Sequence, residues 1–134
     1  MFLSELRDTQ KELFLDLSIY LSMRDGNFAD VEKNTIIQMC KEMGIDKRLV
    51  PVLNFDDVLN QLAESVTIRE KRIIILEIGG VILADVFFST EEESAMKQIS
   101  DSLKIDYSQC KKAIAMIQDL YEVYSKIGSF LSSK

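Results

Sequence analysis

A short acidic turn between two apolar segments is the first place in this sequence where chemistry could occur. The stretch Met23–Glu32 reads MRDGNFADVE, and it carries carboxylates at Asp25, Asp30 and Glu32. Carboxylate oxygens are the ligands that hard divalent cations prefer. Carboxylates near a helix N-terminus are also stabilised by the unpaired N–H groups and the helix dipole. Two hypotheses, a cation site and a capped turn, are therefore open here.

A second acidic turn follows 60 residues later and contains Asp85 and Glu92. Shifting the chain by 60 residues aligns six identical residues without a gap, and apolar positions coincide at matching helical phases. The sequence therefore predicts a duplicated helix-turn-helix unit, with repeat 1 at about 11–46 and repeat 2 at about 71–106. The identical pairs are Asp25 and Asp85, Phe28 and Phe88, Glu32 and Glu92, Gln38 and Gln98, Ile45 and Ile105, and Asp46 and Asp106.

Neither turn has the spacing of an EF-hand loop, which needs oxygen ligands at positions 1, 3 and 5 and a glutamate at position 12. Counted from Asp25, positions 5 and 12 are Ala29 and Ile36; counted from Asp85, position 12 is Met96. A cation site would have to be built between the repeats. With only carboxylate and amide oxygens available, it would take calcium, magnesium or manganese, and not zinc. The candidate metal ligands are Asp25, Asp30, Glu32, Asp85 and Glu92.

Composition excludes several classes of function. The net charge is −6 and the chain has no histidine, so the commonest general base and zinc ligand is missing. The Lys and Arg residues are scattered, which argues against a nucleic-acid partner. An enzyme that pairs the carboxylates of Asp25 and Asp85 is the remaining catalytic hypothesis. Because no nucleophile, phosphate loop or cofactor motif accompanies them, we expect a non-catalytic protein.

The cysteines and the apolar runs indicate a reducing compartment and no membrane insertion. Cys40 and Cys110 lie far apart inside helical patterns, so we expect both to be reduced and buried. The N-terminal residues carry no basic region typical of a signal peptide. The longest apolar run, 73–83, contains Glu77 and is too short to span a bilayer. We therefore expect a cytoplasmic protein.

Helical periodicity runs through the whole chain, and no alternating strand pattern persists. Residues 1–134 are expected to form one all-α domain of about six to seven helices. Capping boxes are predicted at Thr9 and Glu12, Thr67 and Glu70, and Ser89 and Glu92; Asn54 or Asp56 should cap another helix. A helix at about 30–43 should end at Gly44, and Asp106 should open a C-terminal helix at about 107–131.

The segment 68–84 is apolar on nearly every side, as expected of a helix surrounded by others. We expect this central apolar helix to be flanked by the two helix-turn-helix repeats about a pseudo-twofold axis. Its Gly79 and Gly80 predict the close approach of another backbone. Its Glu77 could act as a functional acid, serve as a structural ligand for a neighbouring cap, pair with an Arg, Lys or Tyr in the core, or reach the surface. Tyr107, Tyr121 and Tyr124 are expected to fill core or interface.

The sequence resembles the tellurite-resistance TerB-like family. The shared features are an apolar helix, an Asp-Gly turn and a Glu seven residues after that Asp, and the whole unit is repeated. The opening MFLSELRDTQKELFLDLSIYLSMRDG carries most of the resemblance. It implies a helical bacterial stress-response domain that is not an enzyme and chelates a metal through residues matching Asp25, Glu32, Asp85 and Glu92. Arg24 stands where the family has a small residue, and Val86 replaces the glycine after Asp85.

Two functions follow as expectations. In the first, the chain is a TerB-like cytoplasmic domain that binds or senses a divalent cation through its acidic turns and engages a protein partner. In the second, it is a purely structural protein-interaction module, and the acidic turns only cap helices.

Overall fold

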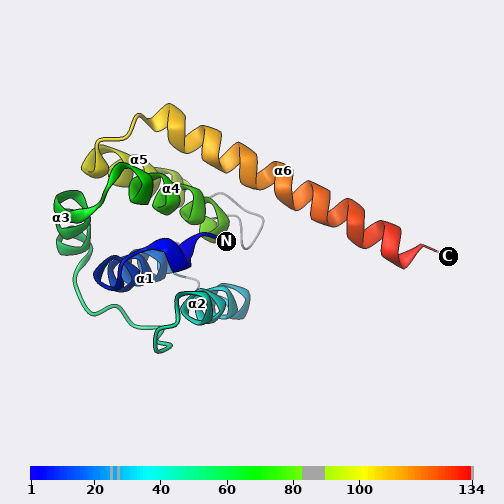
Figure 1. The fold of residues 1–134 in the computed structure, drawn as a ribbon, viewed down its shortest axis with the longest axis horizontal. Helices are drawn as coiled ribbons and strands as arrows, with labels where there is room; N and C mark the ends of the chain where they lie inside the picture. The colour runs from blue at the N-terminus through cyan, green and yellow to red at the C-terminus, as the bar shows by residue number, and fades with distance from the viewer. Residues whose placement is uncertain (25, 27, 83–89, 134) are drawn as a thin grey trace.

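The chain folds into a single all-α domain of six α-helices, seen in a computed structural model that describes residues 1–24, 26, 28–82 and 90–133 (Figure 1). No strand occurs within these residues. The elements are the 3₁₀ turn η1 (Leu3–Glu5), α1 (Asp8–Met23), α2 (Asp30–Met43), α3 (Phe55–Ser65), α4 (Ile68–Ile82), α5 (Thr90–Leu103) and α6 (Tyr107–Ser132).

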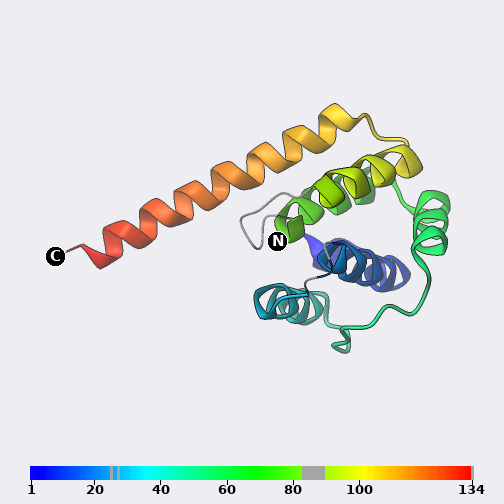
Figure 2. The same ribbon diagram turned by 180° about the vertical axis from the view of Figure 1, so that it is seen from behind.

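Two helices, α1 and α4, form the centre of the domain. α1 packs against α2, α3 and α4, and α4 packs against α1, α6 and η1. α5 completes the body by contacting α3 and α6. The C-terminal half of α6 extends away from this body into solvent, as both views show (Figures 1 and 2).

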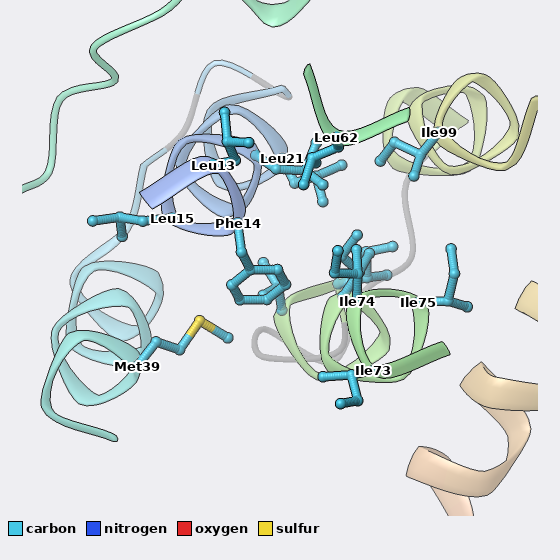
Figure 3. Close-up of a cluster of buried hydrophobic side chains, with 14 of the residues drawn as sticks. Leu13, Phe14, Leu15, Leu21, Met39, Leu62, Ile73, Ile74, Ile75 and Ile99 are labelled. Carbon is cyan, nitrogen blue, oxygen red and sulfur yellow. The ribbon is translucent and has the colours of Figure 1, made fainter. Parts of the chain in front are cut away.

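The core is built from apolar residues of all six helices, and Figure 3 shows the part of it around α1 and α4. Phe14 of α1 points between α2 and α4, towards Met39 and Ile73. Leu62 of α3 and Ile99 of α5 point into the same cluster above Ile74 of α4 in this view. Phe14, Leu62 and Ile99 are fully shielded from solvent, and each such side chain contributes about 1.5–3 kcal/mol of burial free energy.

Most predicted helix ends are confirmed. Asn54 caps α3 by accepting a hydrogen bond from the Asp57 N–H at 2.8 Å. Asp106 caps α6 through the Ser108 N–H. The capping box of Thr67 and Glu70 forms in both directions, at 3.0 and 3.1 Å.

Other predicted positions were wrong or lie outside the described part. The capping box at Thr9 is wrong, because α1 begins at Asp8 and its N-cap is Arg7. Tyr121 and Tyr124 lie exposed on α6, which excludes the core for them and leaves the interface alternative as a prediction. The capping residue proposed for α5, Ser89, is outside the described residues.

The helix bounds follow the 60-residue offset seen in the sequence. α2 and α5 have the same length, and their bounds differ by 60 at both ends. Both end in a left-handed residue, Gly44 at φ 70° and Lys104 at φ 56°. In each case the next N–H, from Ile45 or Ile105, bonds back to a carbonyl five residues earlier, at 3.1 and 2.9 Å. The two ends are thus the same C-terminal motif, built once with glycine and once with lysine.

The predicted close approach at the glycine pair occurs at Gly79. A Cβ placed there would lie 3.7 Å from the Cα of Ile114 and 3.4 Å from Cγ1 of Ile117, so α6 crosses α4 directly above this glycine. At Gly80 the nearest atom would be the Tyr121 hydroxyl, at 3.5 Å. Gly79 therefore determines how closely α6 can lie on α4.

The left-handed ends of α2 and α5 generate a paired prediction. A side chain at positive φ is strained by roughly 1 kcal/mol, and glycine is not. We expect Lys104→Gly to stabilise the domain and Gly44→Ala to destabilise it, each by about 1 kcal/mol. Urea unfolding monitored by circular dichroism measures both. Equal stabilities for all three chains would contradict the shared helix-end geometry.

Candidate functional site

The five predicted metal ligands separate into two groups. Asp25 and Asp85 lie outside the described residues. Asp30 and Glu32 lie in the first turn of α2, and Glu92 lies in the first turn of α5. Asp30 is exposed, whereas Glu32 and Glu92 are both 97% buried at equivalent places of the two repeats.

Glu32 has a structural role that needs no cation. Its Oε1 accepts a hydrogen bond from the Ala29 N–H at 3.1 Å, which satisfies a backbone donor just before α2. Among the described residues, no group of three or more Cys, Asp or Glu side chains is arranged to hold a metal ion. The capping hypothesis for Glu32 therefore has a direct contact to support it.

A third buried carboxylate, which the sequence did not single out, is Asp16 on α1. Its oxygens accept hydrogen bonds from the Arg48 guanidinium and from the N–H groups of Val52 and Leu53, the latter two at 3.0 Å. These contacts bind the irregular segment around Pro51 to α1. Asp16 is therefore a structural anchor for the connection between α2 and α3.

Glu70 is the fourth buried carboxylate, and it joins the start of α1 to the start of α4. Its oxygens accept from Nη2 and Nε of Arg7, at 2.8 and 3.2 Å, and from the Thr67 N–H. The Arg7 hydrogen bonds are the main reason that the pKa of Glu70 falls from 4.5 to about 2. This carboxylate is therefore ionised at neutral pH and occupied by its partners.

Glu77 is bound by main-chain groups of the N-terminal segment. It is 92% buried, and its Oε1 accepts from the Phe2 N–H at 2.8 Å and lies 3.0 Å from the Met1 amino group. Phe2 is the residue just before η1, so the contact fits the alternative in which Glu77 is a structural ligand for a neighbouring cap. Glu77 thus joins that segment to the central helix.

The two thiols are confirmed as reduced and buried. Burial raises the pKa of the Cys110 thiol to about 11 and also raises the pKa of Cys40. Since the thiolate is the reactive form, neither thiol is activated as a nucleophile or as a metal ligand at neutral pH.

An apolar groove of about 620 Å³ lies between α4 and the first half of α6, a size common among binding sites. Its apolar lining includes Ile75, Leu76 and Met116. Its edges carry four cations and one carboxylate, Asp106. No ion pair within the described residues involves these cations, so the groove is a basic surface on an acidic protein. The cations are Lys71, Arg72, Lys104 and Lys112.

An apolar stripe runs from Met116 in the groove along the half of α6 that projects from the body; Figure 2 shows the course of this helix. Met116 belongs to both, and Leu120, Val123, Ile127 and Phe130 follow at alternating spacings of four and three residues. This spacing keeps the side chains on one side of a helix. Leu120 is half-buried, whereas Met116, Val123 and Ile127 are about half exposed and Phe130 is 78% exposed. We call these five residues the α6 stripe.

Sequence reasoning assigned Tyr107, Tyr121 and Tyr124 of α6 to core or interface and did not identify the α6 stripe. The signal was present in the alternating four-and-three spacing from residue 116 onwards. No sequence pattern indicates the groove, because its cations come from separate segments: α4, the α5–α6 turn and α6. Only the folded chain brings those residues together.

No protein-family model, curated protein or solved structure matches this chain. Among the residues described, none of the helices combines the length and apolar character needed to cross a membrane.

The contact between Glu70 and Arg7 predicts a pH dependence of stability. Because the folded-state pKa of Glu70 lies below 4.5, its contribution is fully present above that pH and is lost as the pH falls towards about 2. We expect Glu70→Gln to lower the free energy of unfolding by about 1–3 kcal/mol at pH 7. The difference from wild type should disappear near pH 2.

Denaturant unfolding between pH 7 and pH 2 checks this expectation, with Glu64→Gln on the exposed side of α3 as the control. A Glu70→Gln deficit that is independent of pH would show that the carboxylate charge is not what stabilises the folded state.

Proposed function

We propose that this chain is a non-catalytic helical module that engages a protein partner through the α6 stripe. The observation that carries the proposal is an amphipathic helix whose apolar side leaves the domain body and lies in solvent. Contiguous exposed apolar surface is uncommon on soluble monomers and marks sites of interaction. The body of the domain serves as the scaffold that holds α6 in place.

The energetics favour a partner over an exposed helix. α6 has 26 residues, and the apolar side of its C-terminal half does not pack against the body. Helix propensity alone stabilises such a segment only slightly, because isolated helices are marginal in water. Burial of the stripe would recover about 25 cal/mol for each Å² of apolar surface removed from water. A protein surface with an apolar strip provides that burial.

The same proposal accounts for the carboxylates of the described residues. Asp16, Glu70 and Glu77 each accept hydrogen bonds from groups that hold the fold together. The thiols are protonated at neutral pH. These features support a structural module and give no support to catalysis.

A second candidate is the TerB-like function, a cytoplasmic bacterial stress-response domain that binds calcium, magnesium or manganese. Two observations favour it: Glu32 and Glu92 are buried at equivalent positions, and α2 and α5 share their bounds and end motifs. These also support two helix-turn-helix repeats, α1 with α2 and α4 with α5, related by a pseudo-twofold axis. The ligand set of this candidate is Asp25, Asp30, Glu32, Asp85 and Glu92.

The interaction function predicts a selective loss of binding. Ile127→Glu places a charge in the α6 stripe, and Ser125→Glu places the same charge on the opposite, polar side of α6. We expect Ile127→Glu to reduce capture of a protein partner by at least about tenfold, the loss typical of a disrupted contact at an interface centre. Ser125→Glu should bind like wild type.

Affinity capture from cell extract with each immobilised chain, read by mass spectrometry, measures this loss. Both positions are exposed, so both variants should keep the wild-type thermal midpoint. A partner that all three chains retain would place the interaction elsewhere on the molecule.

The cation function predicts a change in thermal stability. A cation at about 100 times its dissociation constant should add about 2.7 kcal/mol, a shift of several degrees for a domain of this size. Calorimetric unfolding in EDTA and then with calcium, magnesium or manganese tests this for wild type, Asp25→Ala and Asp85→Ala. Glu64→Ala is the control. If neither chelator nor cation changes the thermal midpoint of any of these chains, the cation function is contradicted and helix capping remains the role of these residues.

A further inference from the structure

The spacing of the α6 stripe is that of a seam between two helices. Residues 116, 120, 123, 127 and 130 alternate steps of four and three, so they occupy the a and d places of a seven-residue repeat: Leu120 and Ile127 at a, and Met116, Val123 and Phe130 at d. A stripe of this kind packs best against another helix with the same repeat. The projecting α6 of a second copy is such a helix.

An antiparallel arrangement makes the stripe complementary to itself. When two such helices run in opposite directions, each a residue faces a d residue of the other copy. Leu120 then faces Val123 of the other copy, and Ile127 faces Met116. Because the arrangement is twofold symmetric, each contact forms twice.

The charges beside the stripe favour the antiparallel direction. The g places, just before each a residue, hold Asp119 and Lys126. In an antiparallel pair, g places of the two helices face each other, so Asp119 meets Lys126 of the other copy at two symmetric points. In a parallel pair, g faces e, and Asp119 would meet Tyr124 while Lys126 would meet Leu131. Only the antiparallel pair matches opposite charges.

The basic groove receives the end of the second helix. Since Met116 lies in both stripe and groove, a helix that follows the stripe antiparallel places its last turns, with Ile127 and Phe130, at the groove between α4 and α6. Phe130 is among the most exposed apolar residues of the chain, and the groove has an apolar lining. Each copy thus offers an anchor and a pocket for it.

The electrostatics of the groove fit the same occupant. A helix C-terminus carries a partial negative charge from its unpaired carbonyl groups. The edges of the groove carry Lys71, Arg72, Lys104 and Lys112, and cations beside a helix C-terminus are stabilising. An anionic membrane is disfavoured, because residues 116–131 of α6 contain Asp119 and Glu122 against the single Lys126.

We infer that the partner of the α6 stripe is a second copy of this chain, in an antiparallel, twofold-symmetric dimer that seats Phe130 of each copy in the α4–α6 groove of the other. This inference rests on the proposed interaction function and names its partner. The structure of each body stays as described, and α6 forms the interface.

Sedimentation equilibrium of the purified full chain, over a wide range of concentration, tests the dimer. We expect wild type to dimerise, and Phe130→Glu and Met116→Glu each to raise the dissociation constant by at least about thirtyfold, as interface anchors do. These two residues lie about 21 Å apart on one helix, by its rise per residue. Ser125→Glu is the matched control and should dimerise like wild type.

A charge exchange tests the direction of pairing. Asp119→Lys and Lys126→Asp should each weaken the dimer by several-fold, and the double variant Asp119→Lys/Lys126→Asp should restore it, because the exchanged charges again face each other. Glu122 lies within reach of both positions and pairs with Lys126 at 3.9 Å within one helix. The exchange is therefore made in a Glu122→Gln background, where rescue reports contact between copies. A dimer without rescue would overturn the antiparallel arrangement.

Monomeric wild type at every concentration would overturn the inference. If that monomer captures a different protein and Ile127→Glu loses it, the interaction function stands and only the dimer fails. If the monomer captures nothing through the stripe, both fail. Cosedimentation of monomeric wild type, but not Phe130→Glu, with phosphatidylcholine–phosphatidylserine vesicles would assign the stripe to a membrane and also overturn the dimer.

Discussion

The packing of α4 between α1 and α6 is the constraint on which the rest of this structure depends. α4 is apolar on nearly every side, so it is stable in water only when neighbouring helices cover it. At Gly79 the absence of a side chain lets α6 approach closely, with Ile114 and Ile117 packed over that position. The first half of α6 is thereby held, and its direction out of the domain follows from where it crosses α4.

Buried carboxylates connect this apolar centre to its surroundings. Glu70 joins α4 to Arg7 at the start of α1, and Glu77 joins α4 to the backbone of the N-terminal segment. Asp16 performs the same role on α1 for the segment around Pro51. Each buried charge is compensated by hydrogen bonds, which is the condition under which burial of a carboxylate is tolerated. These three carboxylates thus serve the assembly of the helices, while exposed apolar side chains form a stripe along α6.

The acidic turns and the α6 stripe represent different kinds of candidate site. A cation site in the turns would depend on Asp25 and Asp85 as well as on the buried Glu32 and Glu92. An interface at the stripe requires only that α6 projects in a defined direction. The apolar and charged positions of the stripe are complementary to those of a second, antiparallel α6. Both candidates fit a chain without activated nucleophiles among its described residues. The stripe has the more direct physical support, because exposed apolar surface gains free energy whenever it is covered.

The sequence by itself determined the helices, because periodicity and capping are local: 30–43, Asn54, Thr67 with Glu70, and Asp106 lie where the patterns indicated. The 60-residue repeat likewise reappears in the bounds of α2 and α5. Tertiary structure alone decided which groups meet across the chain. Arg48 reaches Asp16, the N-terminal segment reaches Glu77, and cations from three segments gather at one groove. Such contacts depend on how the helices pack against one another, and local sequence patterns do not predict that packing.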